Sequence, residues 1–67
     1  MTPIERAIEA AGGLGLMATK CKVKYQAVQR WRRTNHVPAE RVLDVEAAAE
    51  GLVSRHRLRP DIYPRAA

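Results

Sequence analysis

The sequence has few of the features that mark secreted, disulfide-bonded or membrane-spanning proteins. Its single cysteine, Cys21, cannot form an internal disulfide, and Glu5 and Arg6 interrupt the N-terminal stretch that a signal peptide would keep apolar. Glycines break the longest apolar blocks well short of the roughly 18 consecutive residues that a membrane span needs. Phenylalanine is absent and aromatic residues make up 4% of the chain, so Trp31 is the largest side chain available for a core. We therefore expect a soluble protein of a reducing cytoplasm.

The length and the lack of catalytic groups disfavour an enzyme. With 67 residues we expect a single domain over residues 1–67, and a chain this short buries only about 60% of the surface that its unfolded form exposes. Such a core leaves roughly 3–5 kcal/mol to spare, which hardly supports a preorganised catalytic pocket. Cys21, His36 and His56 have no partners at the spacing of a zinc site or a catalytic triad. We expect no enzymatic activity, no metal and no cofactor.

The chain carries a net charge of +5, and its charges are unevenly distributed. Six basic residues and no acidic one lie between Lys20 and Arg33, whereas the segment from Ala39 to Gly51 holds four acidic residues against Arg41 alone. A cluster of one sign predicts a polyanionic partner, either nucleic acid or an anionic membrane surface. Membrane binding is disfavoured because the most basic segment lacks the wide apolar face that such binding uses. A second basic group contains Arg55, Arg57, Arg59 and Arg65.

Apolar residues recur at helical spacing along most of the chain, which predicts an all-α fold of four to five short helices with an extended C-terminal tail over residues 59–67. Thr2 and Glu5 have the spacing of a capping box, and Gly12 and Gly51 are placed to end helices. The predicted helices are Pro3 to Ala11, Leu14 to Cys21, a third with Ala27, Val28 and Trp31 on its inward face, Pro38 to about Glu50 with Val42, Val45, Ala49 and Leu52 on its buried side, and one turn from an N-cap at Ser54 to Leu58.

The second and third predicted helices have the spacing of a helix-turn-helix over residues 14–33. Six inward positions agree with that motif, and Ala18 supplies the small residue where the two helices cross. One departure is Lys22, which occupies a turn position that commonly holds glycine and tends to need a positive φ, at a cost of about 1 kcal/mol or more. Besides Ala18, the inward positions that agree with the motif are Met17, Cys21, Val23, Val28 and Trp31.

Two of these anchors, Trp31 and Cys21, have alternative interpretations. Trp31 could stack on a nucleic-acid base, but its three-residue spacing from Val28 favours a place in the core. Cys21 could be a redox or metal thiol, yet it shares a helix face with Met17, so we expect it to be buried. His56 is expected on the exposed side of the last helical turn.

Four segments together carry a family resemblance that covers nearly the whole chain. They are the Gly12-Gly13 break, residues 14–33 ending in Val28-Gln29-Arg30-Trp31, the sequence Val37-Pro38-Ala39-Glu40-Arg41, and the tail from Val53 to Tyr63. With them the chain resembles YdaS-like and Cro/CI-type phage repressors, and Leu58-Arg59-Pro60-Asp61 is the most specific part of the likeness. The resemblance implies a small helical DNA-binding regulator of phage or prophage origin, acting on operators as a homodimer or higher oligomer in a bacterial host. Some Cro relatives build a β-hairpin after the third helix, so residues 52–63 could be helical or form a hairpin.

In a helix-turn-helix the first residues of the second helix face base edges in the major groove. We expect direct readout by Gln26, Gln29 and Arg30, because glutamine suits adenine and arginine suits guanine. Phosphate contacts would position the domain and set its salt dependence, although any single lysine could serve solubility alone. The predicted base contacts are Lys24, Tyr25, Gln26, Gln29 and Arg30, and the predicted phosphate contacts are Lys20, Lys22, Arg32, Arg33 and His36.

These features favour a sequence-specific, Cro-like repressor that occludes an operator on double-stranded DNA as a homodimer. The alternative is an antitoxin, a protein-interaction module that neutralises or autoregulates a partner toxin. The basic tail from Arg55 to Arg65 could contact phosphate, contact a second protomer or remain solvated. We favour docking of Leu58 onto the domain and a dimer role for the residues after it.

Overall fold

The computed structural model describes residues 1–64, and its first helix, α1, spans Pro3–Ala11 as predicted. Both halves of the capping box are present: Thr2 Oγ1 accepts from the backbone N–H of Glu5 at 3.1 Å, and Glu5 Oε1 accepts from the N–H of Thr2 at 2.9 Å. Gly12 ends the helix in the left-handed conformation, with φ 103°. Helix α2 follows at Leu14–Cys21, again with the predicted bounds.

The remaining elements are also helical. Helix α3 spans Tyr25–Thr34, and a 3-10 turn, η1 (Ala39–Arg41), leads into α4 (Val42–Ala48) and then α5 (Arg55–Leu58). Residues 1–64 contain no strand, so residues 52–63 form α5 and turns instead of a hairpin. The predicted all-α, helix-turn-helix class is confirmed. Arg65 and the end of the predicted tail, residues 65–67, lie outside the described part of the chain.

The core forms where one face of each helix meets its neighbours. Trp31 is 6% exposed and Cys21 is 1% exposed, which confirms the core positions predicted for both. The Cys21 thiol lies 3.5 Å from the sulfur of Met17, and burial raises its pKa. The buried apolar residues of this core are Ile4, Ala7, Ile8, Ala11, Met17, Ala18, Cys21, Val28, Trp31, Val37, Val42, Val45, Ala48, Ala49, Val53 and Leu58.

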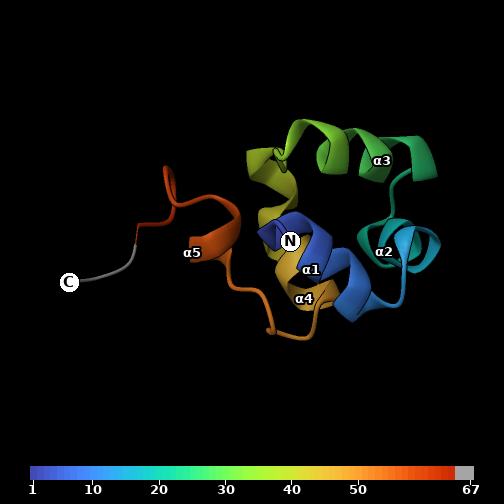
Figure 1. Cartoon of the computed structure of the whole chain (residues 1–67), viewed down its shortest axis with the longest axis horizontal. Helices are drawn as coiled ribbons and strands as arrows, with labels where there is room; N and C mark the ends of the chain where they lie inside the picture. The colour runs from blue at the N-terminus through green and yellow to red at the C-terminus, as the bar shows by residue number, and fades with distance from the viewer. Residues whose placement is uncertain (65–67) are drawn as a thin grey trace.

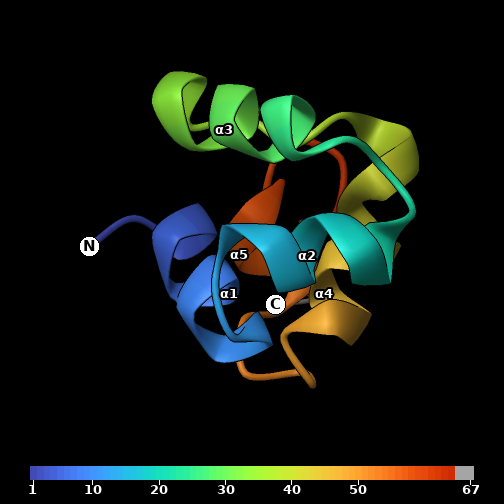
Figure 2. The same ribbon diagram turned by 90° about the vertical axis from the view of Figure 1, so that its right-hand side faces the viewer.

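Helix α3 lies along one side of the molecule. Figures 1 and 2 both place α3 at the top of the view and the segment that follows α4 at the bottom. Helix α2 packs beside the N-terminal end of α3, whereas α5 and the tail lie at the far end from α2 (Figure 1). No other described element covers the outer side of α3 in either view.

Helix α4 is shorter at both ends than the predicted helix from Pro38 to about Glu50. At its start the chain forms η1, whose hydrogen bond spans three residues instead of four. At its end Glu50 and Gly51 both have positive φ, 55° and 76°, and they turn the chain away from the helix axis. Leu52, predicted on the buried side by continued helical spacing, is therefore 73% exposed, and that prediction was wrong.

Helix α5 begins after Ser54 as predicted, but its N-terminus is capped from elsewhere. The Ser54 hydroxyl is buried and has no hydrogen-bond partner among the described residues. The carboxylate of Glu46, on α4, accepts instead from the backbone N–H of Arg55 at 2.6 Å. His56 was expected to be exposed, yet it is half-buried, and its Nδ1 lies 2.8 Å from the carbonyl oxygen of Tyr63.

The residues around α5 dock on the domain. Leu58 is 6% exposed, which confirms its predicted docking, and Val53 is buried beside it in the core cluster. Tyr63 packs against the same cluster, whereas Ile62 is 42% exposed. Most of the described tail therefore folds back onto the domain.

Candidate nucleic-acid interface

The turn between α2 and α3 has the geometry that the sequence predicted. Lys22 adopts the left-handed conformation with φ 58°, and Val23 N–H donates to the carbonyl oxygen of Ala18 at 3.0 Å. Lys24 then returns to an extended conformation, with φ −75°, and serves as the N-cap residue of α3. Ala18 is 5% exposed where α2 and α3 pack together. A lysine therefore holds the strained position of the turn.

The core anchors determine which side of α3 faces outward. Val28 is fully buried and Trp31 nearly so, and a helix turns about 100° per residue. The opposite side consequently carries long polar and cationic side chains. Four of the five predicted base-contacting residues are exposed, namely Lys24, Tyr25, Gln26 and Arg30, and Gln29 is half-buried.

The cations of this surface are not neutralised by carboxylates. The ion pairs found within residues 1–64 involve Arg41, Arg55 and Arg59, all outside α2 and α3. The described acidic side chains therefore leave the basic surface of the helix-turn-helix available to an external anion. We name this surface the α3 face. It consists of Lys22, Lys24, Arg30, Arg33 and the outward side chains between them on α3.

Two shallow hollows flank α3, and six of the ten predicted contacts line them. Gln26 and Arg30 line the first, and His36, which lies just beyond the end of α3, lines it too. Gln29, Arg32 and Arg33 line the second together with Glu5 from α1. Both flanks of α3 therefore carry some of the predicted contacts.

Two predicted phosphate contacts have intramolecular neighbours: Lys20 makes a hydrogen bond, and Arg32 shares a hollow with the Glu5 side chain without forming an ion pair with it. The ammonium group of Lys20 donates to the carbonyl oxygen of Ala11 at 3.2 Å, so it stabilises the C-terminal end of α1. Arg32 lies on the side of α3 that faces α1, where the pKa of the Glu5 carboxyl is lowered, first by its bonds to Thr2 and more weakly by Arg32.

Sequence reasoning missed the roles of two charged residues. Glu46 caps α5 and also pairs with the guanidinium group of Arg55, with Oε1 to Nη2 at 2.9 Å. Arg59 is held by Asp61 and by the backbone of Val37. The two-residue spacing of Arg59 and Asp61 was a readable signal, whereas nothing local connects Glu46 with α5.

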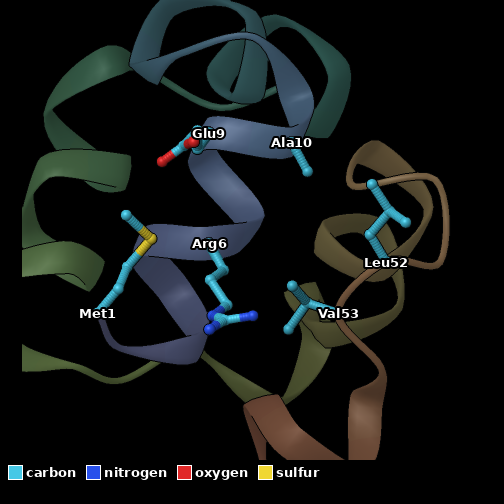
Figure 3. Close-up of a pocket in the computed structure, with 6 residues that line it drawn as sticks. All are labelled: Met1, Arg6, Glu9, Ala10, Leu52 and Val53. Atoms are coloured by element: carbon cyan, nitrogen blue, oxygen red, sulfur yellow. The ribbon is translucent and has the colours of Figure 1, made fainter.

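A further hollow lies between α1 and the segment that follows α4 (Figure 3). Met1 and Leu52, 76% and 73% exposed, lie at its rim, and Arg6 extends toward Val53. It holds none of the predicted nucleic-acid contacts. Among the described helices, none is long and apolar enough to cross a membrane.

Comparison with known proteins agrees with this fold. A family model described as bacterial toxin YdaS matches residues 4–67. The chain is also similar to a solved structure of the Cro protein from the putative prophage element Xfaso 1 in Xylella fastidiosa strain Ann-1, at 35% sequence identity and a TM-score of 0.91. The match covers 97% of this chain and 100% of that one. No curated protein matches the sequence.

Proposed function

We propose that this chain, which belongs to the YdaS-like, Cro/CI-type family, is a sequence-specific DNA-binding regulator that represses transcription by occluding an operator. The observation that carries the proposal is the α3 face, whose outward side chains are long, polar or cationic and have no carboxylate partner among residues 1–64. Likeness to a prophage Cro protein over 97% of this chain and 100% of that one supports it. We also propose that residues 1–67 form one DNA-binding domain that acts in the bacterial cytoplasm.

The α3 face suggests a division of labour between base and phosphate contacts. Gln26, Gln29 and Arg30 would read base edges, each good bidentate pair being worth roughly 1–3 kcal/mol of discrimination. Lys24 and Tyr25 would contact the same groove from the first turn of α3. The phosphate contacts would be Lys22, Arg33 and His36, with Lys20 and Arg32 contributing if DNA draws them from their intramolecular neighbours.

An operator of this kind is read by two protomers. Two copies of α3 reading half-sites about one helical turn apart, roughly 34 Å, would account for a near-palindromic site. We therefore propose a homodimer on DNA, with occlusion of polymerase as the mechanism of repression.

A gel-shift titration tests the proposal. The probe is DNA flanking the protein's own gene, the competitor is random duplex, and the titration is repeated at about 50 and 200 mM salt, because nonspecific binding is electrostatic and salt-sensitive. A preference of roughly 10³ or more for one short site is expected. Equal affinity for both DNAs that disappears at the higher salt overturns the proposal.

A pair of arginine variants localises the interface. Arg30→Ala should lower operator preference by about 10-fold or more, because it removes a proposed base contact. Arg6→Ala is the matched control, since Arg6 is exposed, extends toward Val53 and lines a hollow that holds none of the predicted contacts (Figure 3). Equal losses in the two variants would show that only the total charge matters.

The description of the matching family favours a second candidate, a toxin-related role. It names a toxin, whereas the sequence alone suggested an antitoxin as the alternative. Induced expression of the wild-type chain and of Arg30→Ala in a bacterial host distinguishes the two candidates. Growth arrest that persists in the variant would indicate a toxic action independent of operator binding, and arrest lost with DNA binding would indicate toxicity through misregulated transcription.

A further inference from the structure

The segment Leu58-Arg59-Pro60-Asp61 is the most specific part of the family likeness, and none of its residues is among the proposed DNA contacts. Its arginine is 13% exposed at the side chain, although it lies in a tail at the protein surface. Leu58 is in the core, and the backbone carbonyl of Arg59 accepts from the N–H groups of Ile62 and Tyr63 at 3.2 and 2.9 Å. This turn holds the Arg59 side chain against the domain.

The guanidinium group of Arg59 joins two distant parts of the chain. Its Nε and Nη2 donate to the two carboxylate oxygens of Asp61 at 2.9 and 2.8 Å, which is the bidentate geometry of a strong charged pair. Its Nη1 donates to the carbonyl oxygen of Val37 at 2.7 Å and lies 3.5 Å from Nε2 of His36. We name these three groups, Arg59, Asp61 and the Val37 carbonyl, the clasp.

The clasp holds the segment that follows α3. Asn35 ends α3 with φ 53°, and the N–H of His36 donates to the carbonyl oxygen of Trp31 at 3.1 Å. Val37 is fully buried, and among residues 1–64 its carbonyl oxygen has no hydrogen-bond donor other than the Arg59 guanidinium group. Figure 2 shows residues 59–62 running beside the segment that links α3 to α4.

His36 is placed between two surface hollows. One contains Gln26 and Arg30 of the α3 face, and the other contains Arg59 and Asp61 of the clasp. His36 is itself exposed, and the backbone on its C-terminal side is fixed by the clasp. A change in the clasp would therefore be transmitted directly to a side chain beside the proposed DNA contacts.

We propose that Arg59 is a positioning residue for DNA binding: with Asp61 it fixes the segment 35–37 so that His36 and the C-terminal end of α3 meet the phosphate backbone. This inference rests on the proposed function. We assign Arg59 no DNA contact of its own, because Asp61 and Val37 take three of its five N–H donors and its side chain is only 13% exposed. Asp61 contributes although its negative charge, taken alone, repels DNA.

Two substitutions separate positioning from charge. Asp61→Asn removes a negative charge, so charge alone predicts tighter DNA binding, whereas loss of the clasp predicts weaker binding. Arg59→Lys keeps the charge but loses the planar fork, so charge alone predicts no change. The matched controls are Asp44→Asn on α4 and Arg6→Lys on α1, which make the same chemical changes outside the clasp.

The measurement is operator affinity of the full chain at about 50 and 200 mM salt, for variants whose circular dichroism and melting show that they are folded at the assay temperature. Each phosphate contact contributes a factor of about 3.5 to the ratio of affinities at those salts, since log affinity changes by about 0.9 per contact for each unit of log salt. We expect Arg59→Lys and Asp61→Asn to reduce that ratio about 3.5-fold while base preference is retained. His36→Ala should lower operator affinity by removing a phosphate contact, and combining it with Arg59→Lys should lower the affinity no further than Arg59→Lys alone.

The outcomes distinguish this inference from the proposed function. Suppose that the wild type shows an operator preference. Unchanged binding by Arg59→Lys, or tighter binding by Asp61→Asn, then overturns the positioning role of the clasp and leaves the proposed regulator intact. Additive losses in the variant that combines Arg59→Lys with His36→Ala also overturn it. A wild-type protein with no operator preference overturns both proposals.

Discussion

Removing the Glu46 carboxylate should destabilise the protein more than removing the Ser54 hydroxyl, the reverse of what the position of a helix N-cap suggests. Serine at an N-cap is normally worth about 0.5–2 kcal/mol relative to alanine, because its oxygen accepts from the first free N–H groups. Here the Ser54 oxygen accepts none, and the Arg55 N–H bonds to Glu46 Oε2 at 2.6 Å. The cap of α5 is thus supplied by a residue nine positions earlier.

The expected magnitudes follow from these bonds. Glu46→Ala loses the cap, at about 1–2 kcal/mol, and adds little for the partly exposed ion pair with Arg55. For a domain of this size, that lowers the melting temperature by about 4–16 °C. Ser54→Ala should change stability by less than about 0.5 kcal/mol in either direction, since no hydrogen bond is lost and an unpartnered buried hydroxyl is removed.

Thermal and urea unfolding at pH 7 measure both changes, with Glu9→Ala, at an exposed position of α1, as the control for loss of a carboxylate. The pKa of Glu46 is lowered below its ordinary 4.5 by the side-chain and backbone hydrogen bonds from Arg55. Its contribution is therefore fully present above about pH 4.5 and is lost as the pH falls through the folded-state value. The difference between wild type and Glu46→Ala should shrink in acid. A costly Ser54→Ala together with a neutral Glu46→Ala would refute the reasoning.

Three further outcomes are expected. Lys22→Gly should raise stability by about 0.5–1 kcal/mol in urea unfolding, because Lys22 has φ 58° and glycine adopts that conformation without strain; a loss would show that the lysine stem packs favourably. The bonds from Arg59 lower the pKa of Asp61 from 3.8 to about 2, so wild type should lose stability relative to Asp61→Asn as the pH falls from 4 to 2, and parallel pH profiles would contradict this. Leu52→Ser should be neutral within about 0.5 kcal/mol, whereas Val53→Ala should cost about 1 kcal/mol or more, because only the second residue is buried; equal melting temperatures would contradict that burial.

The elements that sequence analysis predicted correctly depend on contacts within one or two helical turns. The capping box of α1 joins residues three apart, and the left-handed Gly12 and Lys22 lie at the ends of the helices whose turns they close. The outward side of α3 also followed from spacing, because Val28 and Trp31 determine how that helix rotates against the core. These are local determinants, so the order of residues alone was enough to place them.

Prediction was weakest where a residue's partner is distant in the chain or where a helix stopped early. Helical spacing placed Leu52 in the core on the assumption that α4 continues, but the left-handed pair Glu50 and Gly51 ends that geometry first. Nothing in its own helix shows that Lys20 reaches the carbonyl of Ala11, and its assignment to phosphate stays a prediction. The partners of a surface side chain therefore depend on what packs beside its helix as well as on the helix itself.

By itself the sequence determined the all-α class, the bounds of α1 and α2, and the side of α3 that faces outward. The tertiary structure alone decided that Glu46 caps α5 and that Arg59 reaches the Val37 carbonyl, 22 positions earlier in the chain. The physical reason is the range of the interactions: helix periodicity and capping act over three or four residues, whereas these bonds form only after the core has brought α4, α5 and the segment after α3 together.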